Sequence, residues 1–205
     1  MPIPNDQPKA PSDQLGPAEL ASQTELDCQT DSEEHAELDE QTEPLVEIDL
    51  PGTGRELSAP ARQLIEQGRG RFKSVYVFEF VPSNYEMLWD KLDALPRGRF
   101  CEYGSGWGIA TGLAEILGFE AVGIEFSAEL VDASRQLLAE NGLRARIEQG
   151  DYLERVDQAD VYFTYAWPGQ MASIERKFVE MANPDSKFLY CHGQNDIRCK
   201  ALRRG

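Results

Sequence analysis

The sequence predicts a doubly wound α/β fold, in which helices cover both faces of a mainly parallel sheet. Two observations predict it. Apolar strand-like runs alternate with stretches of helical periodicity from residue 99 onward, and a glycine-rich turn joins the first of these strands to its helix. Right-handed crossovers then give the doubly wound topology. We predict three segments: a disordered acidic tail at 1–51, an N-terminal cap segment with a helix at 52–98, and the sheet domain at 99–205.

The N-terminal tail carries most of the net charge of −16. Residues 1–50 contain 14 of the 36 acidic residues and a single base, Lys9. Such a segment buries too little apolar surface to offset the entropy of ordering it. We interpret it as a solubilising leader or, alternatively, as a docking arm for a basic partner. The rest of the chain is nearly neutral, which disfavours nucleic acid as a partner.

Several kinds of site are not indicated by the sequence. The four cysteines form no C-x-x-C pair, and Cys101 and Cys191 lie in apolar runs, which predicts buried free thiols. No cluster of His, Cys and Asp has metal-ligand spacing, so we expect no metal. No apolar run approaches the roughly 18 residues of a membrane span, and the composition of the first residues leads us to expect no secretory leader. We therefore expect a cytoplasmic protein.

The elements before the sheet domain are predicted from the residues that start and stop them. A helix over Pro60–Gln67 is expected to end at the pair Gly68 and Gly70. The run Val75–Val81 is typical of a strand, and the capping-box pattern Ser83–Glu86 begins a helix that stops at Pro96. The sheet domain is expected to hold strands at 99–103, 121–125, 145–148, 160–165 and 187–192, and helices at 109–117, 127–141 and 171–181.

A glycine loop follows the first strand of the sheet domain. In Phe100-Cys-Glu-Tyr-Gly-Ser-Gly-Trp-Gly108, the residues Gly104, Gly106 and Gly108 let the backbone turn tightly and approach a ligand beside a helix N-terminus. An ordinary strand-to-helix turn is the alternative, although it needs fewer glycines. The dinucleotide fingerprint G-x-G-x-x-G would need glycine where this chain has Ile109, so a nicotinamide cofactor is disfavoured.

A second carboxylate stands at the end of the next predicted strand. Glu125 follows Val122-Gly-Ile and comes 23 positions after Glu102. An acid at this place can accept hydrogen bonds from both hydroxyls of a ribose, which requires two acceptor oxygens. The alternative is an acid that interacts with the N-terminus of the following helix.

The pattern acid-x-G-x-G-x-G resembles the first motif of class I S-adenosylmethionine (SAM) dependent methyltransferases. The resemblance implies a Rossmann-like methyltransferase domain with SAM as its cofactor. It implies that the loop, including Ser105, lies against the methionine part of SAM, and that Glu102 helps to fix the loop and the amino group. Asp151, after the third strand, resembles the aspartate that takes the adenine amino group, although Asp is also common in turns. Phe126 and Tyr152 become candidates to pack on the adenine faces.

The resemblance covers roughly residues 75–192. The segment Phe80-Val-Pro-Ser83, together with the glycine loop and Gly123-Ile-Glu125, looks most like the small protein-lysine methyltransferases that modify the ATP synthase c-subunit, and more distantly the Dot1-type histone lysine methyltransferases. In those relatives the Val-Pro-Ser segment lies over the cofactor. The implied activity is methyl transfer to a protein lysine or a similar amine. A small-molecule methyltransferase and a non-catalytic SAM-binding module remain alternatives, and Trp107 departs from the residues usual in the loop.

The acceptor is expected to bind after the fourth strand, where the chain has Thr164-Tyr-Ala-Trp-Pro-Gly169. Tyr165 and Trp167 would orient an amine by cation–π attraction, or they are core residues. His192 is the candidate base, with a structural histidine as the alternative. Because the polar, basic segment Gly193–Gly205 is short, we expect the domain to lack the full C-terminal hairpin typical of the class. The oligomeric state stays open.

Overall fold

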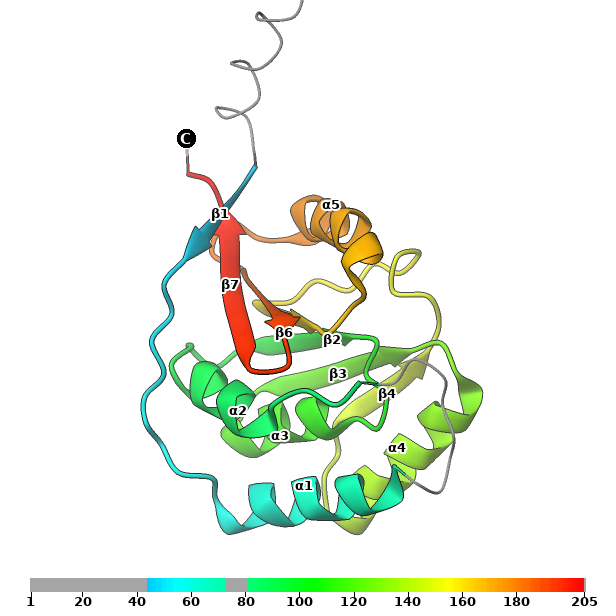
Figure 1. Cartoon of the computed structure of the whole chain (residues 1–205). Helices are drawn as coiled ribbons and strands as arrows, with labels where there is room; N and C mark the ends of the chain where they lie inside the picture. Colours follow the sequence, from blue (N-terminus) through cyan, green and yellow to red (C-terminus); the bar gives the residue numbers. More distant parts are fainter. Residues whose placement is uncertain (1–43, 73–80, 205) are drawn as a thin grey trace, which may run out of the picture. The chain divides into compact units, whose positions relative to one another are not determined.

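The computed structural model describes residues 44–72 and 81–204. Within them a seven-stranded sheet has the order β1-β7-β6-β5-β2-β3-β4 (Figure 1). Neighbouring strands from β6 to β4 pair in parallel, whereas β7 is antiparallel to both β6 and β1. The strands are β1 Leu45–Ile48, β2 Arg99–Tyr103, β3 Glu120–Glu125, β4 Arg146–Gln149, β5 Val161–Thr164, β6 Lys187–Gly193 and β7 Asp196–Leu202.

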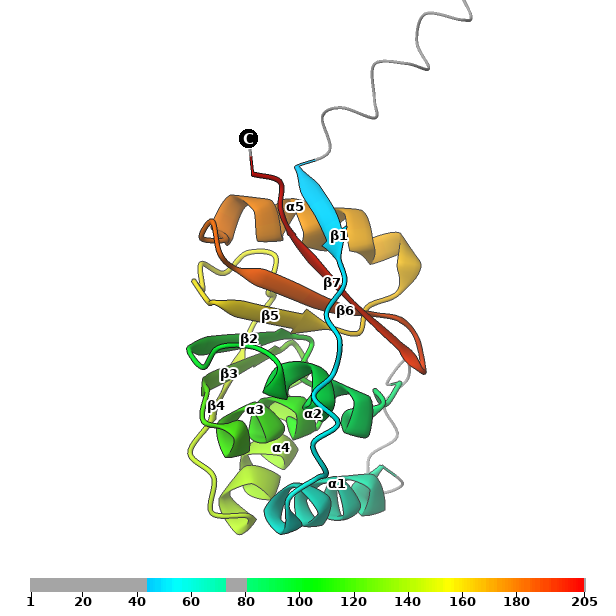
Figure 2. The same ribbon diagram turned by 90° about the vertical axis from the view of Figure 1, so that its left-hand side faces the viewer.

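Helices cover both faces of the sheet, which confirms the predicted doubly wound α/β fold. The packing of α2, α3 and α4 buries one face, and α1 lies against α3 and α4. The other face packs against α5, which stands apart from the remaining helices in Figure 2. The helices are α1 Ala59–Arg71, α2 Tyr85–Asp93, α3 Ile109–Leu117, α4 Ala128–Glu140 and α5 Met171–Met181, with a short 3-10 helix at Pro168–Gln170.

Most predicted elements of the sheet domain are confirmed within one or two residues. The helix α1 continues beyond Gly68, where we expected it to end. A Cβ at Gly68 would lie 2.4 Å from Cδ1 of Ile109, so this glycine permits close packing of α1 on α3. The N-cap of α2 is Asn84 and not the expected Ser83. The strand predicted over residues 75–81 lies outside the described residues, apart from Val81.

A C-terminal hairpin is present, so the prediction that the domain lacks it was wrong. The strands β6 and β7 pair antiparallel. Along β7, the side chains of Ile197, Cys199 and Ala201 are buried, whereas Arg198 and Lys200 between them are partly exposed. This alternation is that of a strand with one face on the core.

The edge of the sheet next to β7 comes from the N-terminal part of the chain. The strand β1 pairs antiparallel with β7, with Leu45 opposite Leu202 and Ile48 opposite Cys199. The prediction of a disordered tail over residues 1–51 is therefore wrong for Leu45–Ile48, and residues 1–43 lie outside the described part. The N-terminal strand covers β7, which would otherwise be an exposed edge.

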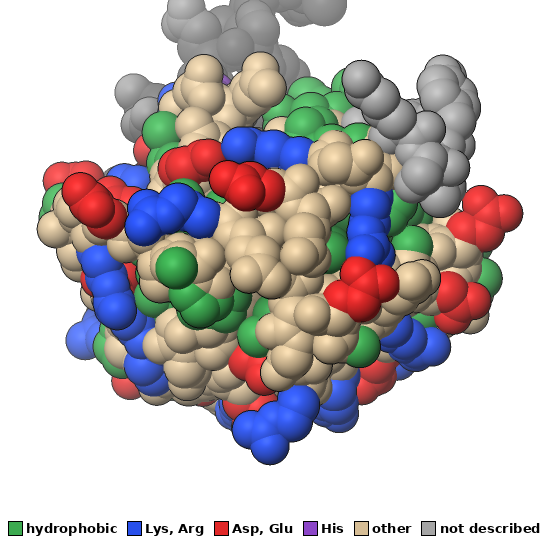
Figure 3. Space-filling view, turned by 90° about the horizontal axis from the view of Figure 1, so that it is seen from below, with side chains coloured by type: hydrophobic (Ala, Val, Ile, Leu, Met, Phe, Trp, Pro, Cys, Tyr) green, Lys and Arg blue, Asp and Glu red, His purple; other side chains and the backbone are tan. Residues whose placement is uncertain are grey.

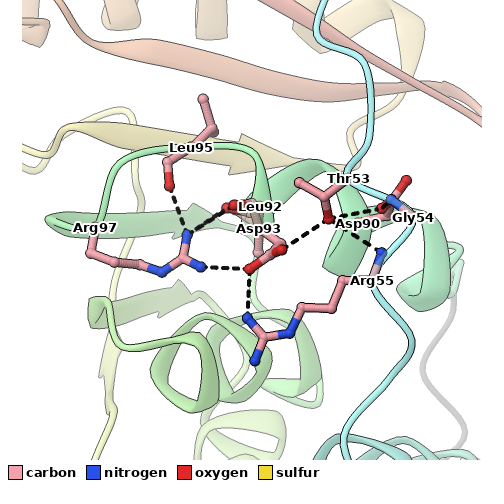
Figure 4. A network of polar contacts seen from close by, with 8 residues as sticks. All are labelled: Thr53, Gly54, Arg55, Asp90, Leu92, Asp93, Leu95 and Arg97. Atoms are coloured by element: carbon pink, nitrogen blue, oxygen red, sulfur yellow. Dashed lines mark hydrogen bonds and ion pairs between the residues drawn. The ribbon is translucent and has the colours of Figure 1, made fainter.

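The segment at residues 49–58, which we call the strap, runs from β1 to α1 and is fastened to α2 (Figure 4). Asp93 accepts hydrogen bonds from the Thr53 hydroxyl (2.9 Å) and from the guanidinium groups of Arg55 (2.8 Å) and Arg97 (2.6 Å). Asp90 accepts a bond from the backbone N–H of Gly54 at 2.7 Å. These contacts fasten the strap to α2.

Other features of the described residues bear on function. The face seen in Figure 3 carries acidic and basic side chains interspersed with one another.

Cys101, Cys191 and Cys199 are buried free thiols, as predicted for the first two. Among the described residues, no helix is long and apolar enough to cross a membrane, and no group of three His, Cys, Asp or Glu side chains could hold a metal ion.

Candidate functional site

A cavity of about 420 Å³ opens at the carboxyl ends of the central strands. Here β2 lies between β3 and β5, so the strand order reverses and the loops diverge, which is where open α/β sheets bind ligands. We call it the first cavity. Of the residues predicted for cofactor or acceptor, it is lined by Glu102, Gly104, Ser105, Gly106, Glu125, Phe126, Asp151, Tyr152, Tyr165 and Trp167.

The glycine loop has the backbone that its sequence predicted. Gly104, Gly106 and Gly108 have φ angles of +74°, +52° and +70°, a region that favours glycine. The N–H groups of Gly104 and Ser105 both donate to the carbonyl of Ile124, at 3.0 and 2.9 Å. Gly108 caps α3 and does not line the first cavity.

Ser105 presents a polar atom that lacks a partner within the described structure. Its side chain is 4% exposed, it lines the first cavity, and its Oγ makes no hydrogen bond there. A buried hydroxyl without a partner is unfavourable by about 1–3 kcal/mol. The loop therefore offers a group that a bound ligand can satisfy.

Gly123 of β3 allows the glycine loop to pack closely on the sheet. A Cβ at this position would lie 2.6 Å from the Cβ of Ser105 and 2.6 Å from Oγ1 of Thr111. Real Cβ atoms do not approach other heavy atoms so closely. The sequence showed this glycine, but nothing in the pattern assigned it a role.

Glu102 is buried and holds the first turn of α3. Its Oε2 accepts hydrogen bonds from the backbone N–H of Thr111 at 2.9 Å and from its hydroxyl at 2.5 Å. These bonds go to α3 and not to the glycine loop. Burial raises the pKa of Glu102 to about 8, against the lowering effect of the bonds from Thr111. The raised pKa favours the protonated, neutral form of this carboxyl group on the wall of the cavity.

Glu125 ties the glycine loop to the N-terminus of α4. Its Oε2 accepts from the N–H of Gly106 at 2.8 Å, and its Oε1 accepts from the N–H of Ser127 at 2.9 Å. The second bond is the helix N-terminus interaction weighed as the alternative role. Each carboxylate oxygen can accept a further hydrogen bond, so these bonds leave capacity for a ligand hydroxyl.

The outer wall of the first cavity is aromatic. Phe126 is 78% exposed, which is unusual for so large an apolar side chain. Tyr152 stacks on Tyr103, with ring centroids 5.2 Å apart and planes 13° from parallel. Asp151 accepts a hydrogen bond from the N–H of Leu153 at 2.8 Å, which is the turn interaction considered for it. The other Asp151 oxygen has no hydrogen bond within the described residues.

A second cavity, of about 540 Å³, adjoins the first between α5 and the strands β6 and β7. The two share Val81, Tyr165, Ala166 and Trp167 in their walls. Trp167 is 51% exposed, whereas Tyr165 is half-buried and burial raises the pKa of its hydroxyl. His192 is exposed, and it lines the second cavity but not the first.

Some residues around the first cavity were not predicted as site residues. Thr164 donates a hydrogen bond to the carbonyl of Tyr103 at 3.0 Å and so joins the ends of β5 and β2. Tyr85 was interpreted only as part of the apolar stripe of α2, yet it lines the cavity. Val81 and Ser83, from the segment expected over the cofactor, line the cavity as well.

Two solved methyltransferases share this fold. No protein-family model and no curated protein sequence matches the chain. An RNA methyltransferase from Salinibacter ruber, solved with S-adenosyl-L-homocysteine (SAH), is 21% identical, with a TM-score of 0.52 over 60% of this chain and 93% of its own. SAH-bound PaMTH1 from Podospora anserina is 19% identical, with a TM-score of 0.54 over 67% of this chain and 64% of its own. The chain therefore has the class I methyltransferase fold.

Proposed function

We propose that this chain is a SAM-dependent methyltransferase. The observation that carries the proposal is the charge of the first cavity. Its acidic lining residues are Glu125, Asp151 and the more deeply buried Glu102, whose raised pKa favours the neutral form, and no Lys or Arg stands among its described lining residues. SAM bears a sulfonium and an ammonium besides its carboxylate, so an acidic cavity suits it better than it suits a nucleotide with phosphates.

Individual positions fit the parts of SAM. The Ser105 hydroxyl, buried without a described partner, suits the amino-acid end of the cofactor beside the glycine loop. Glu125 can accept further hydrogen bonds from the ribose hydroxyls, and Asp151 has an oxygen that can accept one from the adenine amino group. The exposed Phe126 offers a ring face for the adenine. These roles are those implied by the resemblance to class I methyltransferases.

SAM, when bound, supplies a methyl group on a sulfonium, and transfer is an in-line displacement that depends mainly on alignment. The protein's task is to hold the acceptor atom in line and to exclude water. Tyr165 and Trp167 stand in the wall between the two cavities and are proposed to align the acceptor. His192, at the second cavity, is the proposed acceptor of the proton that an amine must lose.

We further propose that the acceptor is an amine, with the lysine side chain of a protein as the favoured case. An aromatic ring attracts an ammonium group through its face, and Trp167 is exposed enough to meet a side chain from another molecule. The chain's likeness to lysine methyltransferases of the c-subunit type supports this acceptor. A free small molecule is the second candidate, because the second cavity has the volume of a small-ligand site.

Calorimetric titration with SAH, with NADH as a parallel control, tests the cofactor. Binding of SAH alone supports the proposal, and labelled SAM with a protein extract and with a metabolite extract then separates the two acceptor classes. SAH binding without transfer to either extract would indicate a non-catalytic SAM-binding module. Binding of neither ligand would refute the proposed function.

A further inference from the structure

The two cavities differ in charge. Among the described residues that line the first cavity, every charged side chain is acidic. The second cavity is lined by two cations, Arg198 and Lys200, and by one carboxylate, Glu175. The difference is not explained by SAM binding, because these cations do not line the first cavity. The charge of the second cavity therefore bears on the methyl acceptor that we place there, and the inference rests on the proposed function.

The cations lie at a definite depth from the shared aromatic wall. In the sheet register Arg198 lies opposite Tyr190, and Tyr190 is level with Thr164. Lys200 lies two residues further along β7, toward the level of the amino end of β5. Tyr165 lies one residue past Thr164, toward the carboxyl end of β5. At about 3.3 Å per residue, the levels of Tyr165 and Lys200 are about 10 Å apart along the strands, and β7 lies two strand spacings, or about 10 Å, across the sheet from β5. Because side chains alternate along a strand, Arg198 and Lys200 project from the same face of the sheet.

The carboxylates that pair with Arg198 lie outside the second cavity. Arg198 contacts Asp196 at 2.9 Å and Glu47 at 3.7 Å, and both acids line a neighbouring cavity, whose wall Arg198 shares. Lys200 donates to Glu175 at 2.6 Å and lies 5.3 Å from the centre of the Tyr190 ring. A guanidinium has five N–H donors and an ammonium three, so each cation keeps donors beyond these contacts.

We infer that the second cavity binds a carboxylate of the methyl acceptor. The acceptor is an amine whose reacting nitrogen lies at Tyr165 and Trp167, and whose carboxylate lies deeper in the cavity, between Arg198 and Lys200. A carboxylate has two oxygens and accepts charge-assisted hydrogen bonds from both cations. The apolar stem between the two groups passes Met171, which lines the same cavity. The carboxylate belongs either to an acidic residue near the methylated lysine of a protein or to a free amino acid.

Two pairs of probes test this inference on the full chain saturated with SAH. In calorimetry at low salt, we expect 8-aminooctanoate to bind about tenfold more tightly than octylamine, which carries a methyl group in place of the carboxylate. Lys200→Ala and Arg198→Ala should each remove most of this preference without changing SAH binding. Lys187→Ala is the matched control, because Lys187 bonds the carbonyl of Asp185 and does not line the cavity.

The second pair consists of the blocked peptides acetyl-Lys-Ala-Ala-Glu-amide and acetyl-Lys-Ala-Ala-Gln-amide. A preference for the Glu peptide alone supports a protein as the source of the carboxylate, and a preference for 8-aminooctanoate alone supports a free amino acid. If SAH binds but neither pair shows a preference, or if the preference survives in both cavity variants, the inference is wrong. Failure of SAH itself to bind counts against the proposed function instead.

Discussion

Replacing Glu125 by glutamine tests how the site is held together. In the wild type its two oxygens accept from the N–H groups of Gly106 and Ser127, at 2.8 and 2.9 Å. An amide keeps one acceptor oxygen and presents an NH₂ group to the other N–H. Because Glu125 is only 9% exposed, water replaces the lost bond poorly. The substitution therefore frees either the glycine loop or the start of α4.

The expected magnitude follows from these two bonds. A hydrogen bond to a charged group contributes about 1.5–3 kcal/mol, so the variant should lose about 2 kcal/mol of unfolding free energy. If Glu125 also binds the ribose, the affinity for SAH should fall about tenfold to a hundredfold, which corresponds to about 1.4–2.8 kcal/mol. Urea unfolding measures the first quantity and calorimetric titration measures the second.

Glu129→Gln is the control, because Glu129 is an exposed acid in the first turn of the same helix. It should change both quantities by less than about 0.5 kcal/mol. If Glu125→Gln lowers stability but binds SAH like the wild type, the ribose role is wrong and Glu125 only supports the loop. If the variant changes neither quantity, the reasoning from the hydrogen bonds is refuted as well.

Three further predictions concern other parts of the fold. Burial raises the pKa of Glu102 to about 8, so the folded state holds this proton more tightly than the unfolded state. Its contribution to stability is then full below about pH 4.5 and is lost as the pH rises to 8, and Glu102→Gln should flatten this part of a pH series of urea unfolding. Gly123→Ala forces a Cβ against Ser105, so we expect a loss of about 1–3 kcal/mol in the same assay and weaker SAH binding. Burial alone would raise the pKa of Asp93, but hydrogen bonds from Thr53, Arg55 and Arg97 hold it below its usual value. The wild type should therefore lose this contribution as the pH falls through the lowered pKa, and Asp93→Asn should be less stable at pH 7 by about 1 kcal/mol.

Each of these predictions has its own control. For the pH series, an equal slope in wild type and Glu102→Gln would mean that another group titrates. Gly70→Ala is the control for Gly123→Ala, because a Cβ at Gly70 meets nothing within 4 Å, and it should be neutral or slightly stabilising. Asp132→Asn removes an exposed acid, so a loss of stability as large as that of Asp93→Asn would show that the strap contacts contribute nothing specific.

The features predicted best from the sequence are those that depend on residues close together along the chain. The bounds of β2 and α3 were predicted to the residue, because an apolar run and the glycine loop mark the end of one and the start of the other. The carboxylates at the strand ends followed from the same pattern, since parallel strands end at one edge of the sheet. What the pattern could not give was which protein groups each acid contacts, as Glu102 and Thr111 illustrate.

The strands β7 and β1 were not predicted, for two different reasons. In β7 the alternation of Ile197, Cys199 and Ala201 with charged residues was present in the sequence, and the charges were given too much weight. In β1 the run Leu45-Val-Glu-Ile48 is too short to stand out within an acidic segment. Its strand conformation depends on pairing with β7, which is a contact between distant parts of the chain.

The pairing of β1 with β7 has a consequence for synthesis on the ribosome. Leu45 emerges early, yet its partner Leu202 lies more than 150 residues later. The ladder between these strands cannot form until β7 has been made, so the nascent chain carries β1 unpaired while the parallel strands β2 to β6 assemble. Completion of the sheet edge is thus delayed until translation of the domain has nearly ended, and during this interval β1 is free to pair with other chains.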